Sequence, residues 1–324
     1  MAPSMSRIRR YFIRYRELGA LFALIATFII FGITSQAYIF RPMSLGSIMS
    51  LSVELGIIAI GQAFLMISGE FDLSVGSVFG VCSAFMAWLL NCGWPLPLAF
   101  AAAIALAACI GLTNGIITIW GEIPSFIATL GMMWFLRGIL LWRTGGFPIH
   151  LQKNYPVLNA IASYIDGTTV RYSTFIFLGL IVLFHFVLSM TRYGNWVQAV
   201  GGAPTTARAL GIPVRKVKLI NFVLCSVLAA LSGIIALARF YTVEPTAGVG
   251  LELESIASAV IGGTSLFGGV GSIVGAAMGA VMVSTIRTGL ILSGAPAYWY
   301  IAFLGIFLII VAVIQQKLTI RRRE

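Results

Sequence analysis

The chain has 324 residues, of which 59% are hydrophobic and only 10% are charged, with a formal net charge of +11. A water-soluble protein of this composition could not cover its surface with polar groups, so soluble fold classes are excluded. The basic residues lie at the ends of apolar runs, a pattern that indicates a membrane protein and argues against a nucleic-acid partner. We therefore expect an all-α, polytopic transmembrane bundle.

Apolar runs and the residues that break them predict about ten membrane helices within one transmembrane domain, residues 18–315. The stretch 253–267 is short for a full crossing, so it is either re-entrant or broken. The most polar long stretch, 144–172, is predicted as an external loop. The ten expected helices cover about 18–35, 45–68, 73–91, 95–119, 125–142, 173–190, 219–240, 253–267, 272–292 and 297–315.

Charge sets the expected orientation. Five arginines precede the first apolar run, which is long for a cleavable signal peptide and is interpreted as an uncleaved first helix. With both termini inside, the segments 1–17, 191–218 and 316–324 contain 14 of the 21 Lys and Arg residues. This two-to-one bias follows the positive-inside rule and predicts cytoplasmic termini and a cytoplasmic 191–218 loop.

No motif indicates a catalytic centre. The sequence has no Gly-Lys dipeptide and hence no P-loop, and its two histidines lie in unrelated segments. The four cysteines have no metal-ligand spacing and are interpreted as small hydrophobic residues. We expect no catalytic residue, no metal site and no cofactor in this chain.

The segment Gly69 to Ser77 lies between two predicted membrane helices. Asp72 or Ser74 can cap the second of these helices by accepting hydrogen bonds from its first N–H groups. Gly76 and its small neighbours allow close helix contact. A cap with close packing accounts for the segment by itself, and a functional role of Asp72 is the alternative.

A second motif lies in the basic 191–218 loop. Thr205 is predicted to cap a short helix that Gly211 ends as a C′ glycine. Such an amphipathic helix either lies on anionic lipid or docks on a protein partner. The residues concerned are Gly201, Gly202, Thr205, Thr206, Ala207, Arg208 and Gly211.

A third motif is rich in glycine and lies between the expected helices 253–267 and 272–292. Glycines recur every four residues from Gly271, which is typical of close helix packing. No lysine lies beside them, so packing explains the motif better than phosphate binding. The residues assigned to packing are Gly262, Gly263, Gly268, Gly269, Gly271 and Gly275.

Polar residues inside membrane helices are costly and usually face a cavity or a partner. Glu54 is the best candidate for a solute pathway, although pairing with a basic neighbour explains it equally well. Arg239 and Arg287 lie nearer the outer helix ends and are expected to extend toward water. The candidate pathway residues are Glu54, Gln62, Asn114, Trp134 and Asn221.

These motifs, in this order, resemble the sugar-type permease family of bacterial ABC importers, the ribose, xylose and autoinducer-2 branch. The resemblance covers about Leu45 to Val313. Asp72 to Ser77 is similar to the family's hallmark, and Asn114-Gly115, Pro124 to Gly131 and Ile261 to Thr264 fit its pattern.

The resemblance implies a permease in the bacterial inner membrane that translocates a monosaccharide or related solute, with a ribose-like pentose as the first expectation. It implies cytoplasmic ATPase subunits that use the ATP, a periplasmic solute-binding protein, and a second permease chain, identical or homologous. Thr205 to Gly211 would be the loop that docks on the ATPase, but it lacks the glutamate that permeases often carry there. The alternative function is an ion-coupled secondary transporter, which would need intramembrane carboxylates.

Overall fold

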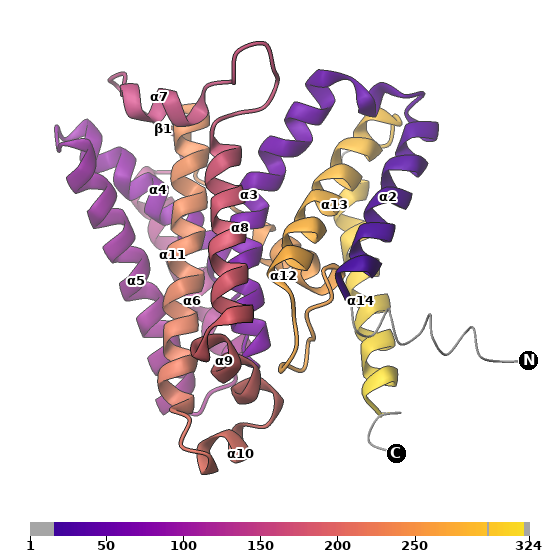
Figure 1. Cartoon of the computed structure of the whole chain (residues 1–324). Helices are drawn as coiled ribbons and strands as arrows, with labels where there is room; N and C mark the ends of the chain where they lie inside the picture. Colours follow the sequence, from indigo (N-terminus) through magenta and orange to yellow (C-terminus); the bar gives the residue numbers. More distant parts are fainter. Residues whose placement is uncertain (1–15, 297, 321–324) are drawn as a thin grey trace, which may run out of the picture.

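The computed structural model of the protein describes residues 16–296 and 298–320, and most of these residues lie in helices (Figure 1). Its two strands, β1 (Ile149–His150) and β2 (Thr242–Val243), form one short antiparallel pair. The prediction of an all-α polytopic bundle is confirmed. Most of the basic N-terminal segment and the last part of the basic tail, residues 1–15 and 321–324, lie outside the described residues.

Helix α3 (Pro42–Ile67) is the centre of the bundle. It is apolar on all sides and packs against α8, α11, α12 and α13, so protein surrounds it instead of lipid. Its most apolar stretch is 83% buried, against 22% for α6 and α8. Helix α11 (Val214–Phe240), the second mostly buried helix, crosses the bundle beside it.

One group of helices lies on the α11 side of α3 (Figure 1). It contains α4 (Val75–Asn91), α5 (Leu96–Trp120), α6 (Ser125–Thr144) and α8 (Ser173–Met190). The short helix α7 (Pro156–Ala162) and the strand pair lie at one end of this group, here called the α7 end (Figure 1). Helices α9 (Arg192–Gly202) and α10 (Pro204–Ala209) lie at the opposite end, the α10 end.

The other group lies on the far side of α3. It contains α2 (Arg16–Thr34), the 3₁₀ turn η1 (Tyr38–Phe40), α12 (Leu251–Ile261), α13 (Ile273–Leu292) and α14 (Trp299–Ile320). Helices α12 and α13 form a tight hairpin. A Cβ added at Gly275 would overlap the backbone of Gly262, and one at Gly279 would overlap that of Ser258. Glycine is required where two helix backbones approach this closely.

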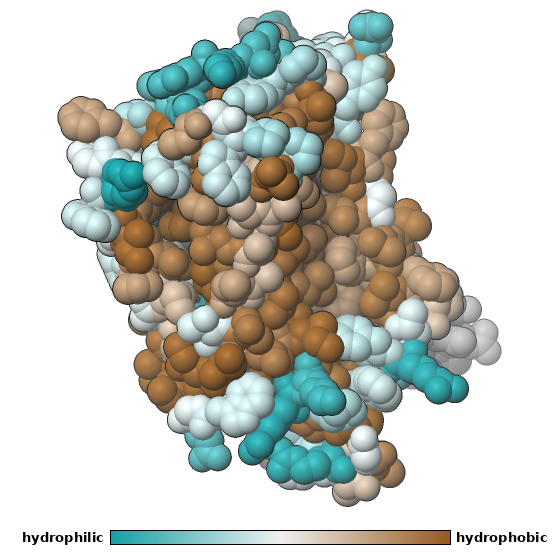
Figure 2. All heavy atoms as spheres, turned by 90° about the vertical axis from the view of Figure 1, so that its left-hand side faces the viewer, coloured by the Kyte–Doolittle hydropathy of each residue, from teal (hydrophilic) through white to brown (hydrophobic). Residues whose placement is uncertain are grey.

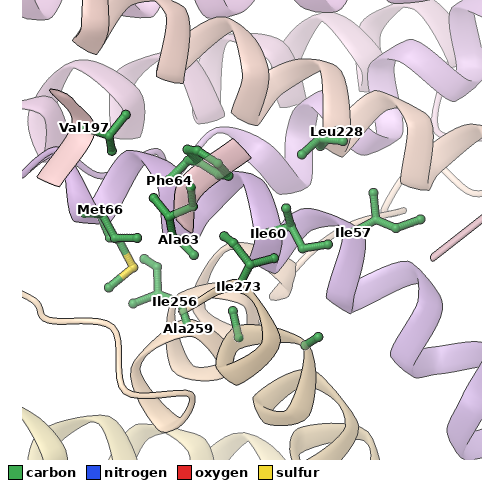
Figure 3. Packing of buried hydrophobic residues seen from close by; sticks show 14 of the residues in the cluster. Ile57, Ile60, Ala63, Phe64, Met66, Val197, Leu228, Ile256, Ala259 and Ile273 are labelled. Carbon is green, nitrogen blue, oxygen red and sulfur yellow. The ribbon is translucent and has the colours of Figure 1, made fainter. Parts of the chain in front are cut away.

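The two groups meet in a hydrophobic core along the half of α3 nearer the α10 end (Figure 3). Side chains of α3 contact helices of both groups, including α9. Because α3 touches every partner here, any displacement of α9 is transmitted to a densely packed interior. The residues labelled in Figure 3 are Ile57, Ile60, Ala63, Phe64, Met66, Val197, Leu228, Ile256, Ala259 and Ile273.

Helices occur at all ten predicted positions in the described chain. Six are long and apolar enough to cross a membrane, whereas α12 has 11 residues and spans only about 16 Å. Three boundaries were wrong by five residues or more. Helix α14 continues to Ile320 instead of ending at 315. Helix α12 ends at Ile261 instead of Phe267, because Gly263 adopts φ +88° and ends it. Helix α11 begins at Val214 instead of Leu219, so its first turn carries the basic residues of the loop.

Candidate functional site

The chain between α3 and α4 is unwound. Helix α3 ends in a Schellman motif: Gly69 has φ +86°, and the N–H groups of Gly69 and Glu70 donate to the carbonyls of Met66 and Leu65. Beyond it, the fully buried Asp72 accepts hydrogen bonds from the N–H and the hydroxyl of Ser74, at 2.7 and 2.6 Å. The segment is therefore folded into the protein interior and is not a solvent-exposed turn.

Neither Asp72 nor Ser74 caps α4 through its side chain, so this expectation was wrong. Ser74 occupies the N-cap position, but its hydroxyl donates to Asp72 instead of accepting from the helix. The physical reason is that a buried carboxylate needs donors, and no cation lies beside it among the described residues. Asn114 of α5 donates to the Ser74 hydroxyl at 2.9 Å and completes this cluster.

Two hydroxyls of α6 satisfy backbone donors of the same unwound segment. Ser125 accepts from the N–H of Phe71, and Thr129 accepts from the N–H of Leu73, both at 3.1 Å. The two hydroxyls are one helical turn apart on α6, which places them on the same face. The motif around Pro124 therefore supplies acceptors to the motif around Asp72, although some 50 residues separate them.

Three segments meet in close backbone contact at the α10 end, in a group that we call the glycine junction: Gly69, Gly201, Gly202, Gly268 and Gly269. The N–H of Gly269 donates to the carbonyl of Ile67, the last residue of α3, at 2.8 Å. A Cβ added at Gly201 would overlap that same carbonyl. The ends of α3 and α9 and the α12–α13 loop are thus held together with no side chain between them.

An ion pair reinforces this end. Lys218, in the first turns of α11, pairs with Glu70 beside the glycine junction. Next to it, burial raises the pKa of the Tyr193 hydroxyl on α9, so the hydroxyl stays protonated and donates to Asn221 of α11 at 2.6 Å. These contacts tie α9 to α11 as well as to α3.

The α9–α10 element protrudes from the bundle (Figure 1). Thr205 does not cap α10, because the helix already begins at Pro204, with Ala203 as its N-cap. Thr205, Thr206 and Arg208 are exposed, whereas Ala207 is buried against the loop that follows. Gly211 has φ +81° with open space around it, as expected of a C′ glycine.

A cavity of about 640 Å³ lies toward the α7 end, between α3, α4, α11 and the strand pair. Its lining combines carboxylates, hydroxyls and aromatic rings. His150 Nδ1 and Thr242 Oγ1 lie 2.8 Å apart across the strand pair at its rim. The polar and aromatic residues that line it are Glu54, Phe79, Ser83, His150, Phe240, Thr242, Glu244 and Thr246.

Two arginines near this cavity pair with carboxylates. Arg239 lies 3.0 Å from Glu54, and Arg287 lies 4.0 Å from Glu254. Sequence reasoning missed Glu244 and Glu254, although a glycine followed by acidic residues marks the start of a helix and could have drawn attention to Glu254. Arg239 is held by Glu54 instead of only extending toward water.

The loop that closes the cavity is also fixed. Arg137, a buried residue of α6, donates to the carbonyls of Ala247, at 2.9 Å, and Pro245. A Cβ added at Gly76 of α4 would overlap the carbonyl oxygen of Gly248 in the same loop. The loop before α12 is therefore clamped between α4 and α6.

The five candidate pathway residues do not lie together. Glu54 lines the cavity, while Gln62, Asn114 and Asn221 are fully buried between helices. Cys225 donates to Gln62 at 3.3 Å, and Asn221 donates to the carbonyl of Phe64 at 3.3 Å. Trp134 is 67% exposed on the outside of α6. The three amides join helices. Glu54 pairs with a basic neighbour, Arg239, and also lines the cavity, so its role in a solute pathway stays a prediction.

Comparison with known proteins identifies related chains. Residues 44–312 match the family described as branched-chain amino acid transport system / permease component. The chain is 33% identical to the autoinducer 2 import system permease protein LsrC of Escherichia coli (strain K12 / DH10B), over 94% of this chain and 87% of that protein. It is 34% identical to the ribose import permease protein RbsC of Escherichia coli (strain K12), over 95% and 97% respectively. No solved structure matches significantly.

The hydroxyls of α6 generate a testable prediction. Replacing Thr129 by valine keeps the shape but leaves the buried N–H of Leu73 without its acceptor, which costs about 1–3 kcal/mol. We expect a clearly lower midpoint of thermal unfolding for the purified variant in detergent. Size-exclusion chromatography of heated samples measures this midpoint. The control is Thr113→Val, because the Thr113 hydroxyl bonds only to Cys109 of its own helix. Equal midpoints for the two variants would contradict the assigned role of Thr129.

Proposed function

The chain belongs to the family of branched-chain amino acid transport system / permease components, and from this premise we propose that it is the membrane-spanning subunit of a bacterial ABC importer for a small sugar-like solute. It is a multi-pass protein of the bacterial inner membrane. Two cytoplasmic ATPase subunits would hydrolyse the ATP, a periplasmic binding protein would deliver the solute, and a second permease chain would complete the pore.

The observation that carries the proposal is the connection between the two ends of the molecule. The exposed α9–α10 element contacts the last residues of α3 through the glycine junction. Glu54, on the same helix, lies 13 residues away, about 20 Å along a rigid rod, and lines the cavity at the α7 end. A displacement of α9 and α10 is therefore transmitted along α3 to the cavity. This coupling requires no covalent chemistry in this chain.

The cavity suits a monosaccharide. Carboxylates and hydroxyls accept and donate hydrogen bonds to sugar hydroxyls, and the rings of Phe79 and Phe240 can cover an apolar sugar face. A ribose-like pentose is the first candidate, in keeping with the ribose import permease among the relatives. The ion-coupled alternative is disfavoured because Arg239 already pairs with Glu54, the one carboxylate among the candidate pathway residues.

Docking of the ATPase on α10 is tested at Gly211. Gly211→Val strains a residue at φ +81° by about 1 kcal/mol or more and should reduce both ATPase co-purification and solute uptake. Gly167 is a matched control, since it has φ +72°, the same open surroundings, and a position at the α7 end. Gly167→Val should keep the ATPase bound. Full ATPase recovery and uptake with Gly211→Val would instead favour a helix lying on lipid.

Transmission through the glycine junction is tested with two adjacent residues of α9. Gly201→Ala overlaps the Ile67 carbonyl, whereas a Cβ at Gly202 meets only Gly269 Cα, at 3.7 Å. In the assembled complex, Gly201→Ala should lower uptake while ATP hydrolysis continues, and Gly202→Ala should leave uptake unchanged. If both variants transport normally, movement does not pass through this junction.

The role of the cavity is tested at Glu244, an exposed carboxylate of its lining that forms no ion pair within the described chain. Glu244→Gln removes a charged hydrogen-bond acceptor and should lower the uptake rate at saturating solute about tenfold. Asp166→Asn changes another exposed acid at the α7 end, outside the cavity lining, and should have no such effect. Equal losses would indicate a surface-charge effect on the binding protein instead of solute contact.

A further inference from the structure

An apolar groove of about 700 Å³ runs between α4, α5 and α6, apart from the proposed pathway. Helix α6 presents one continuous face to it, at the spacing of successive helical turns: Met132, Phe135, Leu136, Ile139, Leu140 and Arg143. Helices α4 and α5 contribute matching faces over 81–88 and 106–113. Side chains of three helices thus form the walls of one elongated groove.

The length of the groove matches one bilayer leaflet. From Met132 to Arg143 the axis of α6 rises about 16 Å, close to half of the hydrocarbon core of about 30 Å. One end lies near mid-membrane and the other reaches the α7 end, where Phe147 and Ile149 of the following segment close it. The left-hand face of the bundle in Figure 1, which includes α5, shows a broad hydrophobic band between hydrophilic ends (Figure 2). This side of the protein therefore faces lipid.

Arg143 is the one charged residue in the groove lining, and it lies at the end where a lipid headgroup would be. Its side chain is exposed, with its guanidinium carbon 5.1 Å from the centre of the Trp88 ring, and it pairs with no carboxylate of the described residues. A cation at the headgroup level above an apolar groove is complementary to a lipid with an anionic headgroup.

We propose that this groove binds one acyl chain of an anionic phospholipid from the leaflet at the α7 end, with Arg143 binding the headgroup phosphate. A second copy of the chain is a poorer occupant. A symmetric contact through this face would have to offer Arg143 a carboxylate, and no Asp or Glu occurs in α4, α5 or α6. A sugar is excluded as occupant because the lining offers it almost no hydrogen-bonding groups.

The test uses fluorescence quenching by phospholipids with brominated acyl chains. The full chain is reconstituted in vesicles that contain brominated phosphatidylglycerol or, for comparison, brominated phosphatidylethanolamine. The fluorescence of Trp88 is obtained by subtracting the fluorescence of the Trp88→Phe variant from that of the natural chain. One positive charge favours an anionic lipid by about fivefold, so phosphatidylglycerol should bind beside Trp88 about fivefold more strongly.

Arg143→Gln should abolish this preference. Arg41→Gln is the matched control and should preserve it, since Arg41 is also exposed at the α7 end and also stacks on a ring, 4.0 Å from the centre of Tyr38. Trp134, exposed on α6 but outside the groove, should show no lipid preference when isolated in the same way.

Equal quenching of Trp88 by the two lipids would overturn the proposal, as would a preference that survives Arg143→Gln. Protection of Trp88 from both lipids would also overturn it, because protein would then cover the groove.

Discussion

A bilayer offers no water to an unpaired peptide group, and this constraint governs the architecture around α3. The chain interrupts a helix inside the protein between Ser68 and Ser74, where an extended backbone would be left with free donors. Ser125 and Thr129 accept two of these donors, and Asp72 accepts a third. The interruption therefore fixes the position of α6 relative to α4, and the groove and the clamped cavity loop depend on that position.

Close backbone contact is the second requirement, and glycine meets it in two places. In the α12–α13 hairpin, it lets a helix too short to cross the membrane pack against a full-length neighbour. In the glycine junction, it brings the end of α9 against the end of α3 with no flexible side chain between them. Contacts of this kind transmit displacement because backbones cannot rotate out of the way, as side chains can.

The charged residues inside the bundle are placed beside groups that compensate their charge. Glu54 and Glu254 each have an arginine partner near the cavity, which offsets part of the cost of burying their charges, whereas the buried Asp72 is satisfied by N–H and hydroxyl donors. Glu244, in the cavity lining, forms no ion pair within the described chain and is the carboxylate proposed to contact a polar solute. Arg143 is the contrasting case, since it faces lipid with only an aromatic ring beside it. An uncompensated charge is costly beside lipid as it is inside the bundle, and an anionic lipid is therefore a suitable partner for Arg143.

The sequence by itself determined the membrane class, the places of the ten helices and the identity of the interrupting motifs, because hydropathy, glycine and proline act locally along the chain. It also singled out Glu54, as a charged residue inside a membrane helix, and the turn at Gly211, where a positive φ favours glycine. Only the tertiary structure decided what each polar group binds. Thr129 accepts a hydrogen bond from Leu73, and Arg239 pairs with Glu54. The amides Gln62, Asn114 and Asn221 join helices instead of lining a cavity. These partners lie far apart in the sequence, and no local pattern encodes which of many buried polar groups will come within hydrogen-bonding distance of one another.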